Sequence, residues 1–184
     1  MSRAPLPEML SPVTLILGGA RSGKSRYGEH LAEARPGPLF YVATAQAGDA
    51  EMADRIARHR AHRGPRWQTV EEPLDLAAVL RAAENREGAV LVDCLTLWLS
   101  NLLHARRDPV AETEALLDVL PTLTRPVIFI SNEVGLGVVP ENALARAFID
   151  QAGWMHQRLA EAADTVLFMA AGQAMPLKQA KQAK

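Results

Sequence analysis

Five short apolar runs recur along the chain. They are VTLIL, LFYVA, AVLVD, VIFIS and TVLFM, at residues 13–17, 39–43, 89–93, 127–131 and 165–169. Each run is almost continuously apolar, with no strict alternation of apolar and polar residues, which is typical of a strand buried on both faces of a sheet. We therefore predict five buried strands.

Stretches with helical patterning separate or follow these runs. The predicted helices span residues 24–34, 50–62, 75–85, 95–105, 110–120 and 142–163. Strands that alternate with helices predict an α/β fold, with a mostly parallel sheet flanked by helices. We expect a flexible proline-bearing leader at 1–12, a single catalytic domain at 13–178 and a basic tail at 179–184.

The composition excludes several classes of protein. Of the 184 residues, 48% are hydrophobic and 22% are charged, which is enough apolar material for a folded core. Lys+Arg 20 against Asp+Glu 21 gives a net charge of −1, without the basic excess of a general nucleic-acid binder. No apolar run has the length of about 18 residues that a membrane span needs. We expect no nucleic-acid partner and no membrane span.

A single cysteine, Cys94, excludes an intramolecular disulfide and a zinc site built from several cysteines. One unpaired thiol suits a reducing compartment, and the first twelve residues lack the apolar stretch of a signal peptide. A cytoplasmic location is therefore expected. Cys94 is interpreted as a packed core thiol or, alternatively, as a reactive one.

The segment GGARSGKS at residues 18–25 fits the phosphate-loop pattern G-x-x-x-x-G-K-[ST]. It follows the first predicted strand and opens a predicted helix, so backbone N–H groups and the helix N-terminus would hold phosphate oxygens. Lys24 would reach the β- and γ-phosphates, and Ser25 would hold Mg²⁺. The alternative is a glycine turn with an exposed lysine. The predicted nucleotide-binding residues of this loop are Gly18, Gly19, Ala20, Arg21, Ser22, Gly23, Lys24 and Ser25.

Asp93 ends the third apolar run. A phosphate loop requires an acidic residue at the end of a second buried strand to position Mg²⁺, usually through water. An aspartate at this place can instead cap the helix that follows, here LTLWLSNLL. Magnesium or nucleotide binding is the favoured interpretation, and capping is the alternative.

The segment MADRIARHRAHR at 52–63 combines arginines with two histidines, His59 and His62. It is either a solvated helix face or an anion site, because arginine binds phosphates in a bidentate manner. On a helix, Met52, Ile56 and His59 share one face, while His62 lies at its flank. His59 can then be a core residue or a nucleophile that attacks phosphorus. It can also form a metal-binding pair with His62, but no further histidine or cysteine is positioned to complete such a site.

Taken in order, GGARSGKSRYGE, YVATA, RIARHRAHRG, VDCLTLWLSNLL and NEVGLGVVPEN resemble one family closely. It is the bifunctional adenosylcobinamide kinase/adenosylcobinamide-phosphate guanylyltransferase family of cobalamin biosynthesis, and the resemblance runs from about Thr14 to Lys178. It implies a RecA-like P-loop fold and a homotrimer. It also implies two reactions, transfer of the γ-phosphoryl group of ATP or GTP to adenosylcobinamide, and transfer of GMP from GTP to the resulting phosphate.

The same resemblance implies roles for individual residues. His59 corresponds to the guanylylated histidine, and Lys24 is the second catalytic residue. At His156 this chain departs from the family, which often has asparagine there. Beyond the phosphate loop, the implied nucleotide-binding residues are Ala43, Thr44, Ala45, Arg60, Ala61, His62, Arg63, Glu71 and Asp93.

Two other functions remain open from the residues alone. One is a small-molecule kinase without a covalent step, in which His59 is a spectator. The other is a nucleotide-binding switch that senses GTP or ATP without turnover. An arginine-flanked histidine on an inward helix face argues against both.

Overall fold

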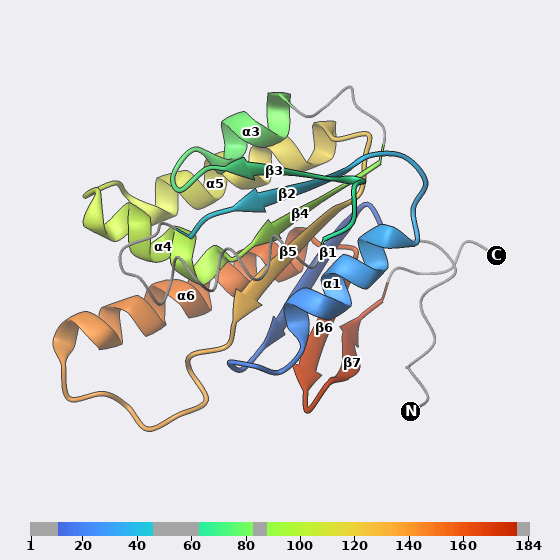
Figure 1. Cartoon of the computed structure of the whole chain (residues 1–184). Coiled ribbons are helices and arrows are strands. Elements are labelled where there is room, and N and C mark those ends of the chain that lie inside the picture. The colour runs from blue at the N-terminus through green and yellow to red at the C-terminus, as the bar shows by residue number, and fades with distance from the viewer. Residues whose placement is uncertain (1–10, 46–62, 83–87, 180–184) are drawn as a thin grey trace.

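The computed structural model describes residues 11–45, 63–82 and 88–179, which form a seven-stranded sheet with the strand order β3-β2-β4-β5-β1-β6-β7 (Figure 1). Neighbouring strands from β3 through β6 are parallel, and β7 runs antiparallel to β6. The strands are β1 (Val13–Gly18), β2 (Leu39–Ala43), β3 (Trp67–Glu71), β4 (Ala89–Asp93), β5 (Val127–Asn132), β6 (Thr165–Ala170) and β7 (Gln173–Lys178).

Helices cover both faces of the sheet (Figure 1). One apolar cluster packs beneath α1, and a larger one joins the opposite face to α3, α4, α5 and α6. The helices are α1 (Lys24–Glu33), α3 (Leu76–Ala82), α4 (Leu95–His104), α5 (Pro109–Val119) and α6 (Ala143–Ala162), with a 3₁₀ turn at Leu120–Thr122.

The continuous apolar runs are buried on both faces, as predicted. In β1, Leu15 and Leu17 belong to the larger cluster, whereas Ile16 between them belongs to the cluster under α1. Successive side chains of a strand point to opposite faces, so a strand between two helical layers needs apolar residues at every position. The predicted α/β class and mostly parallel sheet are confirmed.

All five predicted strands are present, but two further strands were not predicted. β3 has the sequence WQTVE and is largely exposed at one edge of the sheet. β7 has the sequence QAMPLK, contains Pro176 and forms the other edge. Edge strands need no continuous apolar run, and this is why the pattern of buried strands missed them.

Five of the six predicted helices are present, with boundaries that shift by a residue or a few. The helix predicted at 50–62 lies outside the described residues. Nowhere in the described ranges is there a helix that combines the length and the apolar character needed to cross a membrane.

Candidate active site

The carboxyl ends of the parallel strands bring the predicted site residues to one edge of the sheet. Ala43 at the end of β2 is the register partner of Asp93 on one side and of Glu71 on the other. Gly18 at the end of β1 pairs with Asn132 at the end of β5. Ligands of open parallel sheets bind at this edge, so the strand topology places the phosphate loop and Asp93 on the same side of the molecule.

The phosphate loop connects β1 to α1, and two of its glycines have conformations that other residues rarely adopt. Gly18 has φ 150°, and a Cβ there would lie 2.4 Å from the carbonyl oxygen of Met169. Gly23, with φ 97°, is the N-cap of α1. The loop is also tied to the β6–β7 turn, because the N–H of Gly172 donates to the carbonyl of Ser22 over 3.0 Å.

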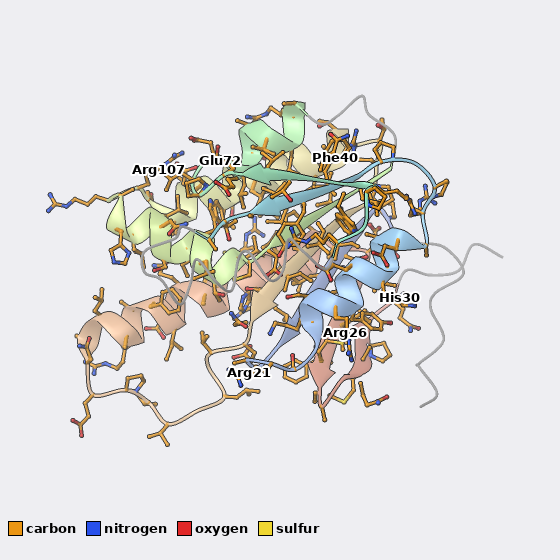
Figure 2. The ribbon with its side chains drawn as sticks, in the orientation of Figure 1. Arg21, Arg26, His30, Phe40, Glu72 and Arg107 are labelled. Atoms are coloured by element: carbon orange, nitrogen blue, oxygen red, sulfur yellow. The ribbon has the colours of Figure 1, made fainter. Side chains whose placement is uncertain are left out.

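Lys24 lies inside this loop. Its side chain is buried, with the whole residue 6% exposed, and its Nζ donates to the carbonyl oxygen of Gly19 over 2.7 Å. The alternative of a glycine turn with an exposed lysine is therefore wrong. Ser25 follows in the first turn of α1, where backbone N–H groups lack partners within the helix. Figure 2 shows Arg21 at the loop, on the exposed side.

Asp93 is oriented by a buried tyrosine. The hydroxyl of Tyr41 donates to Oδ2 of Asp93 over 2.8 Å. Burial, and next the charge of Asp93, raise the pKa of Tyr41, so the phenol stays protonated and keeps donating. Cys94 is the N-cap of α4, without a side-chain capping bond, so the alternative that Asp93 caps this helix is wrong.

Arg63 joins three elements around Tyr41. Its guanidinium carbon lies 3.1 Å from the centre of the Tyr41 ring, a cation–π contact. Its Nε donates to Glu29 of α1 and its Nη1 to Thr69 of β3, both over 3.3 Å. With 6% of its side chain exposed, Arg63 is held against the fold. The other residues predicted in this segment, His59, Arg60, Ala61 and His62, lie outside the described residues.

Thr44 connects the ends of β2 and β4 through hydrogen bonds. Its hydroxyl donates to the carbonyl of Cys94 and accepts from the N–H of Cys94, both over 2.8 Å. Its own N–H donates to the carbonyl of Asp93, and its carbonyl accepts from Asn101. Thr44 is thus a positioning residue, whereas its neighbours Ala43 and Ala45 are half-buried at the edge. Cys94 is buried, as expected of a core thiol, and burial raises its pKa.

Two polar residues at this edge were missed from the sequence. Tyr41 was counted only as part of an apolar strand, although a buried tyrosine needs a partner for its hydroxyl. Asn132 ends β5, and its Nδ2 donates to Thr96 at the start of α4 over 2.9 Å. Each could have been noticed from its polar side chain. Tyr41 lies within an apolar run, and Asn132 lies directly after one.

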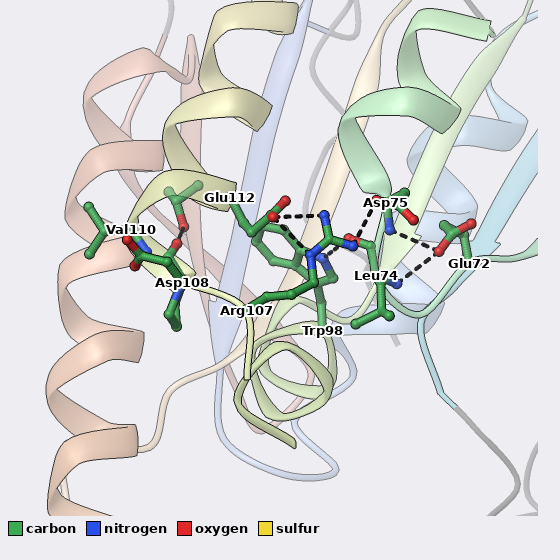
Figure 3. Close-up of polar contacts among 10 residues, drawn as sticks. Glu72, Leu74, Asp75, Trp98, Arg107, Asp108, Val110 and Glu112 are labelled. Atoms are coloured by element: carbon green, nitrogen blue, oxygen red, sulfur yellow. Dashed lines mark hydrogen bonds and ion pairs between the residues drawn. The ribbon is translucent and has the colours of Figure 1, made fainter. Parts of the chain in front are cut away.

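A second polar cluster supports the connection between β3 and α3 (Figure 3). Glu72 accepts from the backbone N–H groups of Leu74 and Asp75, each over 2.8 Å. Arg107 pairs with both Asp75 and Glu112, and Trp98 donates to the carbonyl of Leu74. These contacts hold α3, α4 and α5 together and have a structural role.

Comparisons with known proteins identify the family of this chain. The family model of cobinamide kinase / cobinamide phosphate guanyltransferase matches residues 14–177. A bifunctional adenosylcobalamin biosynthesis protein of Pseudomonas aeruginosa, CobP, is 55% identical over 167 residues, covering 89% of this chain and 96% of that protein. The protein CobU of Salmonella typhimurium, described by the same words, is 39% identical over 179 residues, covering 89% and 98%.

Two solved structures are similar in fold alone. The RadB recombinase has a TM-score of 0.53 at 19% identity, covering 86% of this chain and 75% of that one. A protein from Pyrococcus horikoshii OT3 has a TM-score of 0.56 at 9% identity, covering 95% and 89%. The likeness to a recombinase confirms the RecA-like P-loop fold that the sequence implied.

Proposed function

Because this chain belongs to the cobinamide kinase / cobinamide phosphate guanyltransferase family, we propose that one nucleotide site at the carboxyl edge of its sheet serves both activities. The chain is a bifunctional enzyme of adenosylcobalamin biosynthesis. The observation that carries a shared site is the placement of Lys24 inside the phosphate loop, at the same edge as Asp93.

In the kinase reaction, the γ-phosphoryl group of ATP or GTP passes to the aminopropanol hydroxyl of adenosylcobinamide. Lys24 and the loop N–H groups bind the phosphate oxygens and stabilise the charge that moves to the departing diphosphate. The Ser25 hydroxyl and the Asp93 carboxylate, whose Oδ2 is fixed by Tyr41, are the oxygen donors that Mg²⁺ prefers. When bound there, Mg²⁺ supplies further neutralisation of phosphate charge.

In the transferase reaction, a ring nitrogen of His59 attacks the α-phosphorus of GTP. The N–P bond forms while the bond from the α-phosphorus to the bridging oxygen breaks, and pyrophosphate leaves with the electron pair. An oxygen of adenosylcobinamide phosphate then attacks the same phosphorus, the N–P bond breaks, and His59 is regenerated. A covalent intermediate of this kind divides one difficult displacement into two easier ones.

The position of Arg63 supports this role for His59. Arg63 follows His59 by four positions, a length of chain that can span at most about 14 Å. Arg63 itself is held on Tyr41, which bonds to Asp93. A histidine four positions before Arg63 is therefore a reasonable candidate for the attacking group at this edge. We further propose that Arg60, Ala61, His62, Arg63, Ala43, Ala45 and Glu71 surround the nucleotide.

The assembly and location are proposals as well. We propose a homotrimer, whose contacts include the exposed apolar residues Leu136, Val138 and Val139, which are 81%, 94% and 75% exposed in the single chain. Exposed apolar groups of this kind mark interaction surfaces.

We also propose a cytoplasmic enzyme, on the basis of its unpaired Cys94.

The covalent step has a direct test. The pure protein is incubated with Mg²⁺ and GTP labelled at the α-phosphate, without corrinoid, and then denatured. We expect protein-bound label that is acid-labile and alkali-stable, lost in His59→Ala and retained in the control His104→Ala, which changes an exposed histidine at the end of α4. A folded, GTP-binding protein that takes up no label would contradict the guanylyl-histidine, and would leave the plain kinase or the nucleotide switch.

A further inference from the structure

A pocket of about 340 Å³ lies between the segment that follows β5 and the helix α6. Glu133, Val134 and Gly135 line one side. The α6 side includes Ile149, Asp150, Gly153, Trp154 and His156. The nucleotide mechanism above makes no use of this pocket.

Glu133 connects the pocket to the phosphate loop. It directly follows Asn132, the last residue of β5, and its N–H donates to the carbonyl oxygen of Gly18 over 3.0 Å. β5 lies between β4, which ends in Asp93, and β1, which leads into the loop. Adjacent strands are about 4.8 Å apart, so the Glu133 backbone lies within two strand spacings of both phosphate-site components.

The lining of the pocket is unsuited to a polyphosphate. Glu133 and Asp150 are its charged residues, and neither lysine nor arginine is among the described residues that line it. Burial lowers the pKa of His156, so its imidazole is neutral at pH 7, and its Nε2 lies 2.7 Å from the hydroxyl of Ser131. Ile149 and Trp154 add apolar surface. An uncharged molecule with an apolar part and a polar group fits these walls better than an anion does.

The two reactions differ in their need for a base. In the kinase step the acceptor is an alcohol, whose proton must leave as the new bond forms. In the transferase step the acceptor is a phosphate oxygen, which carries no proton to remove at neutral pH. A carboxylate at the end of β5 would therefore serve the first reaction and not the second.

From these observations we propose that the pocket receives the hydroxyl-bearing end of the kinase acceptor, and that Glu133 is the general base of the kinase step. This inference rests on the proposed function. The Glu133 carboxylate takes the hydroxyl proton while the oxygen bonds to the γ-phosphorus. The bond from that phosphorus to the β–γ bridging oxygen breaks, the nucleoside diphosphate leaves with the electron pair, and Glu133 later releases the proton to water.

The test compares three activities in the wild type, Glu133→Gln, Glu133→Asp and the control Asp118→Asn, which changes an exposed carboxylate of α5. The activities are phosphoryl transfer from γ-labelled ATP to adenosylcobinamide, labelling of the protein by α-labelled GTP, and GMP transfer to adenosylcobinamide phosphate. Removal of a general base costs about 10²–10⁴-fold in rate. We expect kcat of the kinase to fall by about 100-fold or more in Glu133→Gln, while both GTP reactions stay within about twofold.

Further readouts separate a base from a structural residue. Glu133→Asp should restore part of the kinase rate, because it returns a carboxylate to this position, whereas Glu133→Gln should not. Unchanged kinase activity in Glu133→Gln would overturn the proposal, and so would an equal loss of all three activities. Absence of protein labelling in the wild type would count against the proposed function alone, since the kinase comparison does not depend on it.

Discussion

Gly18 and Gly19 are adjacent in the sequence, but only the position of Gly18 requires a residue without a side chain. A Cβ at Gly18 would contact the Met169 backbone at 2.4 Å, and its φ of 150° is unfavourable for other residues, whereas a Cβ at Gly19 meets nothing within 4 Å. We expect Gly18→Ala to lower the free energy of unfolding by about 1–3 kcal/mol. Gly19→Ala should stay within about 0.5 kcal/mol of the wild type. Urea unfolding of both variants measures this, and equal losses would contradict it.

His156 makes a second prediction at the residue scale. Burial lowers its pKa in the folded protein, although the Glu133 charge opposes this. The unfolded chain, with an ordinary pKa near 6.5, then binds more protons than the folded one as the pH falls below that value. The stability that neutral His156 contributes is present above about pH 6.5 and is lost as the pH falls toward the folded pKa.

Urea unfolding at pH 7.5 and pH 5.5 tests this dependence. In His156→Asn, which keeps a polar group opposite Ser131, the loss of stability between the two pH values should be smaller than in the wild type by about 1 kcal/mol. Parallel pH dependences in the two proteins would show that His156 does not titrate in this way.

At this scale the sequence indicated residues whose chemistry is local, but not the contacts between residues that are far apart in the chain. Lys24 and Asp93 were predicted as site residues because a loop pattern and the end of a strand are each visible within one segment. Tyr41 bonds to Asp93 across 52 positions, and Arg63 reaches Glu29 across 34 positions. Such contacts depend on the order of strands in the sheet, which spacing along the chain does not reveal. Glu133 was visible in NEVGLGVVPEN, but its pocket was not.

At the scale of elements, the structure explains the end of the NEVGLGVVPEN segment. Asn142 is the N-cap of α6, and its Oδ1 accepts from the N–H groups of Leu144 and Ala145 over 2.8 and 3.2 Å. A side-chain cap satisfies N–H groups that have no partner inside the helix. Asn142 therefore fixes where the 20-residue helix begins, and with it one wall of the pocket.

We expect Asn142→Ala to lower the free energy of unfolding by about 1 kcal/mol, with faster hydrogen exchange at Leu144 and Ala145. Asn142→Asp keeps a capping oxygen and serves as the matched control. An alanine variant as stable as the aspartate variant would mean that the cap does not stabilise α6.

The elements that the sequence predicted are those with a strong apolar signal. β1, β4 and β5 are buried on both faces and were each found from a continuous run. β3 is exposed along most of its length, and so is β7, which also contains Pro176. Their strand conformation comes from pairing with β2 and β6, a tertiary effect that local preference does not encode.

At the scale of the whole molecule, the proposed trimer has a measurable mass. Light scattering should give about 60 kDa, three times the chain mass of 20.0 kDa. Val138→Glu should shift the mass toward that of a single chain, because a charge buried in an apolar contact is costly. Val110→Glu, at an apolar residue of α5 that is 39% exposed, is the control. A wild-type monomer would contradict the trimer, and an unaffected trimer would contradict this surface.

The two edge strands of the sheet, β3 and β7, are poor templates for the addition of another strand. At one margin, β7 has a proline, which lacks the N–H that a docking strand requires, and it ends in the charged Lys178. At the other, the exposed residues of β3 are glutamine, threonine, valine and glutamate, so its apolar surface is small. Neither edge offers a long apolar template for cross-β growth, the usual starting point of amyloid. We therefore expect the seven-stranded sheet not to extend by edge-to-edge pairing at high protein concentration. Contacts between copies of the chain would then be made by loops and helices.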